Sequence, residues 1–202
     1  KANYDQLNEL IKSFGGIAEM RKTEELNSFW TGQGITENNQ WINEALGLTT
    51  FSKHNNFICI LDTGINNGHS LIEPVLENQN LMTVEPGWGI NDSDGHGTNM
   101  AGVATYGNLN AVLENNNPIE IKHQLESVKI LHPNFPNENL KLPMLTREAV
   151  DRAIINNPEG KRIFCMAVTT NFQVDFGKPS TYSSVLDKII FGEDENDKKI
   201  FV

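Results

Sequence analysis

Apolar residues recur at two different spacings along the chain, and each spacing predicts its own kind of element. Short unbroken apolar runs that end in turn residues are typical of buried strands in a parallel sheet. Such runs predict strands at 57–61, 127–131, 163–168 and 199–202. Apolar residues three and four positions apart indicate amphipathic helices instead. They predict helices at 4–14, 41–47, 98–106, 146–155 and 180–190.

The order of these elements predicts the fold class. From residue 55 onward strands alternate with helices, and this alternation produces βαβ units in an open parallel sheet. We therefore expect an α/β fold of three layers, with helices on both faces of the sheet. Thr146 and Ser180 precede amphipathic stretches and are expected to cap their helices. Two polar stretches rich in Asn and Pro, 108–117 and 132–142, are expected to be surface loops.

Charge and composition exclude several classes of protein. The 202 residues include 16 Lys and Arg against 26 Asp and Glu, which gives a formal net charge of −10. Nucleic-acid binding needs a basic face, so nucleic acid is not an expected partner. No apolar run approaches the roughly 18 residues of a membrane helix, so no membrane association is expected. The first residues lack a secretion signal, and the cytoplasm is the expected compartment.

Cys59 and Cys165 both lie within apolar runs. A cysteine in such a run usually acts as a small buried hydrophobic residue, which is what we expect of both. The alternatives are a reactive thiol or a disulfide.

Two segments carry residues suited to catalysis. Asp62 follows the apolar run 57–61, at the carboxyl end of a predicted strand, where catalytic groups collect in open α/β sheets. His96 stands between Gly95 and Gly97, at the start of a helix of small residues that can approach the sheet closely. A carboxylate that accepts from Nδ1–H fixes the tautomer of an imidazole and leaves Nε2 free to take a proton. The sequence therefore predicts a general base formed by Asp62 and His96.

Other interpretations of these segments are open. Asp62-Thr63-Gly64 also matches the Asp-Thr-Gly loop of aspartic proteases, but that class needs an all-β fold with a second such loop or a dimer. Asp92 and Asp94 precede His96 and are expected to form hydrogen bonds within their loop. Raising the pKa of His96 or binding a cation are the alternatives for these two carboxylates. The remaining histidines show no metal-ligand spacing, and no metal site is expected.

Taken together and in this order, the two segments resemble those of the subtilisin-like serine proteases, or subtilases. The matching motifs are Asp62-Thr63-Gly64-Ile65 with His69, Asp92-Ser93-Asp94-Gly95-His96-Gly97-Thr98 with Ala101-Gly102, and Val128-Lys129-Ile130-Leu131. The chain order Asp, His, Ser is the one that subtilisin uses. The resemblance implies a serine endopeptidase that hydrolyses polypeptides through an Asp-His-Ser triad and an acyl-enzyme. It makes Asp62 the residue that orients the imidazole and His96 the general base and acid.

The resemblance also implies a substrate-binding segment and a division of the chain. Ala167, Val168 and Thr169 stand where subtilases pair with substrate backbone. No serine here lies in a Gly-Thr-Ser-like helix start, so we expect 55–202 to be the N-terminal part of a subtilase catalytic domain. The subtilase fold would then be incomplete in this chain. The chain would be inactive by itself, and its partner would be the remainder of that domain. Residues 1–54 match no motif and are expected to form an N-terminal helical extension.

Several positions depart from the family pattern. Ser70-Leu71 stand where many subtilases have Pro-Asp, whose carboxylate helps to bind a structural calcium. No cofactor is expected, and a calcium site of that type would lack its usual carboxylate. The long link 106–126 resembles that of divergent bacterial subtilases. Two alternatives to an active enzyme are a pseudo-protease that binds peptides or assembles with a partner, and a structural subdomain.

Overall fold

The computed structural model of the protein describes residues 4–16, 34–135, 141–168, 179–192 and 199–202. The chain divides into two units, Lys1–Asn38 and Asn39–Val202. In the first unit, α1 (Tyr4–Ser13) is a helix without buried residues, which confirms the helix predicted there. Within the described parts of the chain, every helix is too short or too polar to span a lipid bilayer.

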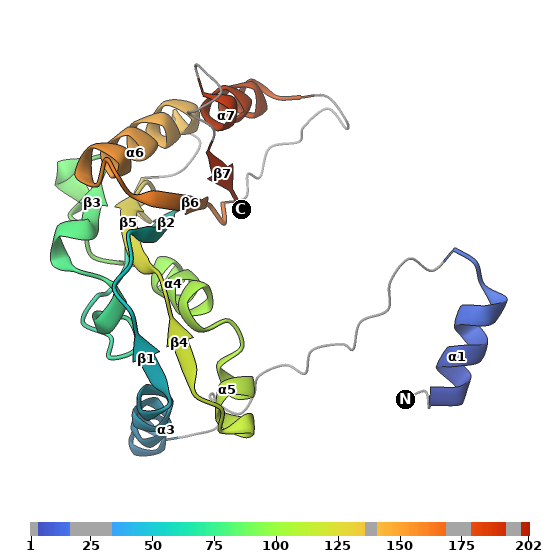
Figure 1. The fold of residues 1–202 in the computed structure, drawn as a ribbon. Coiled ribbons are helices and arrows are strands. Elements are labelled where there is room, and N and C mark those ends of the chain that lie inside the picture. The colour runs from blue at the N-terminus through green and yellow to red at the C-terminus, as the bar shows by residue number, and fades with distance from the viewer. Residues whose placement is uncertain (1–3, 17–33, 136–140, 169–178, 193–198) are drawn as a thin grey trace. The chain divides into compact units, whose positions relative to one another are not determined.

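The second unit is built on a five-stranded parallel sheet with the order β3-β5-β2-β6-β7 (Figure 1). Its strands are β2 (Asn56–Asp62), β3 (Leu81–Thr83), β5 (Gln124–Lys129), β6 (Lys161–Cys165) and β7 (Ile200–Phe201). Four of these strands were predicted from apolar runs. The edge strand β3 was not predicted. The central position of β2 places the end of that strand in the middle of the sheet edge.

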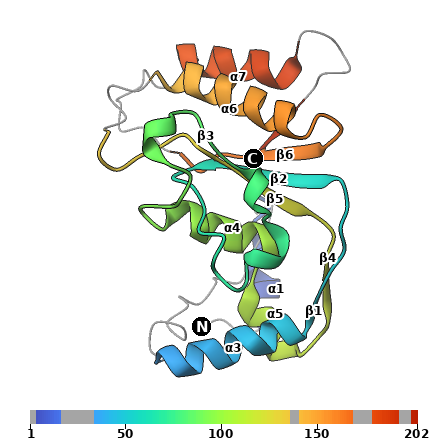
Figure 2. The same ribbon diagram turned by 90° about the vertical axis from the view of Figure 1, so that its left-hand side faces the viewer.

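Helices cover both faces of this sheet, so the fold has the three layers expected of it. Figure 2 shows α6 (Leu142–Asn156) and α7 (Thr181–Phe191) on one face and α4 (His96–Tyr106) on the other. Alternation along β2 explains this arrangement: Cys59 and Leu61 pack in the core beneath α6 and α7, and Ile60 packs in the core against α4. Because the strand is buried on both sides, its sequence is an unbroken apolar run.

Of the two predicted helix N-caps, the structure confirms one and contradicts the other. Ser180 caps α7 as predicted, since its hydroxyl accepts a hydrogen bond of 3.1 Å from the backbone N–H of Ser183. The prediction for Thr146 was wrong, because α6 begins at Leu142 with a proline in its first turn, where proline fits well. Thr146 is instead buried inside the helix, with its hydroxyl 3.0 Å from that of Tyr182.

The stretch 108–117 was predicted to be a loop, and that was wrong for most of its length. It contains α5 (Leu109–Asn115), whose start is capped by the side chain of Asn108. Next, β4 (Ile119–Ile121) pairs in parallel with β1 (Thr49–Phe51), which follows α3 (Ile35–Gly47). This second, two-stranded sheet is separate from the first. Short 3₁₀ helices η1 (Glu73–Val75), η2 (Asn78–Asn80) and η3 (Pro86–Trp88) lie between β2 and α4.

The two cysteines are free thiols. In the strand register, Cys59 lies opposite Phe164 and Cys165 lies opposite Ile60. Neighbouring positions of a strand point to opposite faces of the sheet, so the two thiols are separated by the sheet itself. Burial raises the pKa of both, most strongly for the fully buried Cys59. A disulfide between them is therefore excluded, and Cys59 behaves as the buried apolar residue that was predicted.

Candidate active site

Asp62 is the last residue of β2, and its side chain is 1% exposed. The turn that follows holds it in place: the backbone N–H of Thr63 donates a hydrogen bond of 2.7 Å to Asp62 Oδ1. Gly64 then adopts a φ of +98°, and a Cβ there would lie 2.8 Å from the carbonyl oxygen of Ile90. Only glycine fits both the left-handed conformation and the contact. The chain therefore turns sharply over the end of the sheet and leaves the carboxylate facing α4.

His96 is the first residue of α4, and its ring faces that carboxylate. Its Nδ1 lies 2.9 Å from Asp62 Oδ1 and 2.8 Å from Oδ2. An ionised carboxylate only accepts hydrogen bonds, so Nδ1 carries the proton and the neutral ring has its lone pair on Nε2. The imidazole is 49% exposed, while its partner is almost completely buried. One end of the pair is thus fixed and the other can exchange protons.

The pair forms because α4 approaches the end of β2 unusually closely. A Cβ on Gly97 would lie 2.1 Å from the carbonyl oxygen of Gly64 and 3.3 Å from Cβ of Asp62. In place of a side-chain contact, the backbone N–H of Gly97 donates to Thr63 Oγ1 at 3.1 Å. The glycine after the histidine is therefore a requirement of packing: any side chain there would push the helix away from the sheet.

The surroundings of His96 raise its pKa above the usual 6.5. The hydrogen bond to Asp62 is the largest cause and the negative charge of Asp62 is the next, while partial desolvation opposes them. The charges of Asp94 and Asp92 add smaller contributions in the same direction. The imidazolium of His96 therefore loses its proton, and becomes a base, at a higher pH than an isolated histidine does.

In the loop before His96, the predicted hydrogen bonding within the loop is confirmed for Asp92. Asp92 accepts hydrogen bonds from Asp94 and Gly95 of its own loop, at 3.0 and 2.9 Å. Asp94 is exposed to solvent, and its charge, like that of Asp92, raises the pKa of His96, which was the alternative for these two carboxylates. Among the described residues, no group of three side chains is placed to hold a metal ion.

Lys129 is part of this neighbourhood, although the sequence reasoning did not single it out. It lies beside Asp62 in the register of β5 and β2 and is 1% exposed. Its Nζ donates to the carbonyl oxygen of Asn91 at 2.7 Å and to Ser93 Oγ at 3.2 Å. The sequence did contain a signal for this role, because Lys129 stands within the mostly apolar run 127–131 and a lysine is rarely buried without partners.

The predicted substrate-binding segment lies only partly within the described residues. Strand β6 ends at Cys165, three residues earlier than predicted. Ala167 is exposed and Val168 is partly buried just beyond it, while Thr169 lies outside the described residues. Because β6 neighbours β2, this segment follows the strand beside Asp62. Its role in binding substrate stays a prediction.

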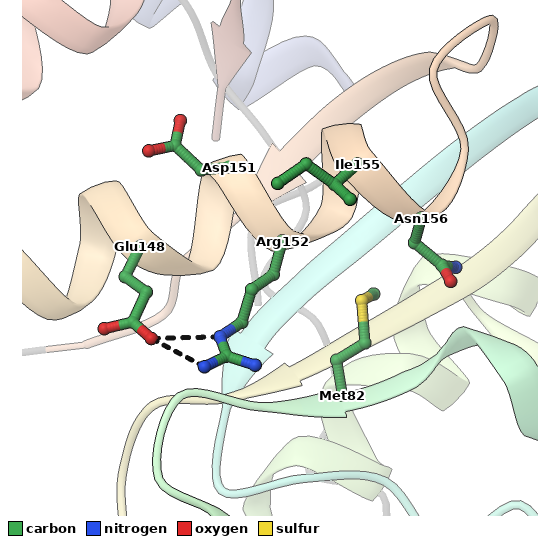
Figure 3. Close-up of a pocket in the computed structure, with 6 residues that line it drawn as sticks. All are labelled: Met82, Glu148, Asp151, Arg152, Ile155 and Asn156. Atoms are coloured by element: carbon green, nitrogen blue, oxygen red, sulfur yellow. Dashed lines mark hydrogen bonds and ion pairs between the residues drawn. The ribbon is translucent and has the colours of Figure 1, made fainter.

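A hollow of about 460 Å³ lies elsewhere, between α6 and Met82 of β3 (Figure 3). Glu148 and Arg152 form an ion pair of 2.7 Å along its wall, one turn apart on α6. This hollow belongs to the α6 side of the sheet, whereas His96 belongs to the α4 side. It is therefore not part of the Asp62–His96 site.

A buried carboxylate that orients a half-exposed imidazole at the carboxyl end of a parallel sheet can serve as the general base of a nucleophilic hydrolase. Comparison with known proteins identifies the family. The chain belongs to the subtilase family, whose model matches residues 53–202. This confirms the resemblance based on the sequence motifs, and membership implies a serine peptidase that acts on polypeptides. Searches among curated proteins and solved structures found no match.

Proposed function

We propose that this protein is a serine endopeptidase in which Asp62 and His96 are two members of an Asp-His-Ser triad. The observation that carries the proposal is the contact of His96 Nδ1 with both oxygens of Asp62, at 2.9 and 2.8 Å. The burial of the carboxylate and the exposure of the ring support the same roles. In this proposal residues 55–202 form the N-terminal part of the catalytic domain, and residues 1–54 form an N-terminal extension that includes the helices α1 and α3 and the strand β1.

The chemistry is acyl transfer through the imidazole. His96 Nε2 takes the proton of a serine hydroxyl while the serine oxygen attacks the peptide carbonyl carbon. Collapse of the tetrahedral intermediate breaks the C–N bond, and His96 gives the proton to the leaving amine. A water molecule then attacks the acyl-enzyme with His96 again as the base, which releases the acid and restores the serine. Asp62 stabilises the imidazolium that exists between these proton transfers.

Substrate binding is assigned to the segment 167–169. An extended polypeptide can add to it by strand pairing, in which backbone N–H and C=O groups supply the hydrogen bonds. The exposure of Ala167 and the position of the segment after β6, beside the central strand, support this role. Strand pairing is independent of side-chain identity, so it tolerates the Ala-Val-Thr sequence found here.

The test is labelling of the full-length natural protein with a fluorophosphonate, read by intact mass and peptide mapping. We expect one covalent adduct on a serine, and we expect the His96→Ala variant to lose it. Peptide mapping then identifies the nucleophile. A well-folded wild-type protein that forms no adduct would contradict the proposal and favour a pseudo-protease that binds peptides without cleaving them.

A further inference from the structure

The carboxylate of Asp92 accepts an unusually large number of hydrogen bonds. Its Oδ1 accepts from Thr63 Oγ1 at 2.9 Å, Asp94 N at 3.0 Å and Gly95 N at 2.9 Å. Its Oδ2 accepts from the backbone N–H of Thr98 at 2.9 Å and from the Thr98 hydroxyl at 2.6 Å. An ionised carboxylate offers about four lone-pair positions, so five donors use its full capacity.

These donors come from both elements that carry the proposed catalytic pair. Thr63 directly follows Asp62 at the end of β2, while Gly95 and Thr98 lie on either side of His96 at the start of α4. Thr63 Oγ1, which donates to Asp92, also accepts from the backbone N–H of Gly97 at 3.1 Å. One carboxylate thus joins the turn after the aspartate to the helix turn that presents the histidine.

The start of α4 depends on this carboxylate for its capping. The residue before the helix is Gly95, which has no side chain to accept from the free backbone N–H groups of the first turn. Asp92 performs this function from four residues before His96, and its charge lies at the end of the helix that favours an anion. Burial by itself would raise the pKa of Asp92, but hydrogen bonds from Thr98, Asp94 and Gly95 lower it to about 2. The carboxylate is therefore ionised at neutral pH.

The loop that carries Asp92 is also held from the sheet side. The buried Nζ of Lys129 donates to the carbonyl oxygen of Asn91 and to Ser93 Oγ, the residues on either side of Asp92. Thr98 Oγ1 in turn accepts from the backbone N–H of Asn66, which ties the same network to the turn after β2. Asp92 is therefore fixed by neighbours on three segments. Because it is fixed, it can hold the start of α4 in one position.

From these contacts we infer that Asp92 is a positioning residue for the Asp62–His96 pair, fixing the start of α4 against the end of β2. The inference rests on the proposed function for its kinetic consequence, while its structural part concerns the pair itself. Asp92 forms no hydrogen bond with the imidazole within the described part of the chain. It acts through Thr63 and Thr98, and its charge has a second, smaller effect that it shares with Asp94.

The shared charge effect provides a matched control. Asp92→Asn and Asp94→Asn each remove one negative charge near His96, but only the first places an amide NH₂ against donors that need an acceptor. We expect Asp92→Asn to lower kcat of the full-length enzyme about 100-fold with KM nearly unchanged, since a shift of about 1 Å in a catalytic group has that cost. Asp94→Asn should lower kcat less than about threefold.

The second readout needs no catalysis. An NMR titration of the His96 ring protons in the full-length protein reports the pKa of His96. The hydrogen bond to Asp62 is the largest cause of the rise in this pKa above 6.5. In Asp92→Asn this pKa should fall clearly toward 6.5, and it should fall less in Asp94→Asn. Equal shifts in the two variants, or a wild-type titration in Asp92→Asn, would overturn the inference.

A second pair of variants covers the case in which Asp92→Asn does not fold. Thr98→Val removes the hydroxyl donor at almost constant volume, and Thr98→Ser keeps it. We expect the pKa of His96 to fall in Thr98→Val and to return toward the wild-type value in Thr98→Ser. Identical titrations for the two would contradict the positioning role. Absence of fluorophosphonate labelling in the wild type would instead count against the proposed function, and the titration would still decide the positioning.

Discussion

Two buried carboxylates on the strands of this sheet each contact a nitrogen-bearing side chain at the same distance, but the two pairs differ in their exposure to solvent. Asp62 and His96 approach to 2.8 Å at the carboxyl end of β2, and Glu126 and Arg162 approach to 2.8 Å between β5 and β6. The imidazole of the first pair is 49% exposed, whereas the guanidinium of the second is 5% exposed. Both carboxylates are essentially buried, so the two pairs differ in the exposure of the nitrogen-bearing side chain.

The second pair has several further hydrogen-bond partners inside the protein. Arg162 donates to both oxygens of Glu126, at 2.8 and 3.0 Å, and also to the carbonyl oxygens of Ala153 and Asn157 at 2.9 Å. These carbonyls lie at the end of α6, where a cation compensates for unpaired acceptors. Asn157 Nδ2 adds a hydrogen bond of 2.7 Å to Glu126 Oε1. This pair fixes the end of α6 to the sheet.

The comparison shows that exposure and proton chemistry, more than the strength of the contact, separate a structural pair from a reactive one. An arginine does not release a proton in proteins, so the buried pair can only stabilise the structure. A histidine with one nitrogen bound to a carboxylate can still exchange a proton at the other. The same geometry therefore supports stability in one region and chemistry in the other.

The largest expected effect comes from removing the reactive pair. Asp62→Asn or His96→Ala in the full-length enzyme should lower kcat by about 10⁴-fold, because the base loses its tautomer or is absent. Circular dichroism of each variant should match that of the wild type, which would show that the lost turnover is not due to unfolding. Steady-state kinetics on a peptide substrate provides the measurement, and wild-type turnover in either variant would contradict the assigned roles.

Breaking the structural pair should reverse this result. Arg162→Met leaves a buried carboxylate without its cation and should lower the free energy of unfolding by about 3–5 kcal/mol. Urea denaturation measures this loss, and kcat per folded molecule should be little changed.

The double variant Glu126→Gln with Arg162→Met sharpens the point, because it removes the orphaned charge. It should be more stable than Arg162→Met. If the double variant were less stable by the full sum of the two single losses, the pairing described above would be wrong.

A smaller effect is expected where α4 meets β2. Gly97→Ala inserts a Cβ where the carbonyl oxygen of Gly64 stands, so the helix must move away from the strand. Overpacking of this kind costs about 1–3 kcal/mol, and the displaced imidazole should lower kcat as well. Thermal unfolding and kinetics report the two losses. Gly102→Ala is the control, because a Cβ at Gly102 in the same helix would meet no atom within 4 Å.

The smallest effect concerns pH. Since the pKa of His96 is raised above 6.5, kcat/KM should fall as pH decreases through a value above 6.5, because the protonated ring cannot act as a base. Stability has the opposite sign: the protonated ring favours the folded state, so this contribution is complete below 6.5 and is lost as pH rises through the raised pKa. Solvent screening keeps it small, because the ring is half exposed. A pH–rate profile with its acid limb below 6.5 would contradict this expectation.

The central part of this protein was predictable from local sequence patterns. Strand β2 is buried along most of its length, so its apolar run was visible without any knowledge of its neighbours. Asp62 and His96 were found because glycines mark both turns, where the backbone must bend or approach closely. The N-cap of α7 was found because Ser180 bonds to a residue only three positions away. In each case the information is local.

The remaining features could not be predicted in this way, because their stabilising contacts join residues that are far apart in the chain. The strands β1 and β4 have three residues each and exist through mutual pairing, as Thr49 lies opposite Ile119. The five donors around Asp92 include Thr63, 29 residues away. Glu126 and Arg162 are 36 residues apart, and neither resembles a core residue in its sequence context. A local pattern predicts an element that local burial and caps define, but long-range hydrogen bonds and charge pairs become visible only when the chain brings their partners together.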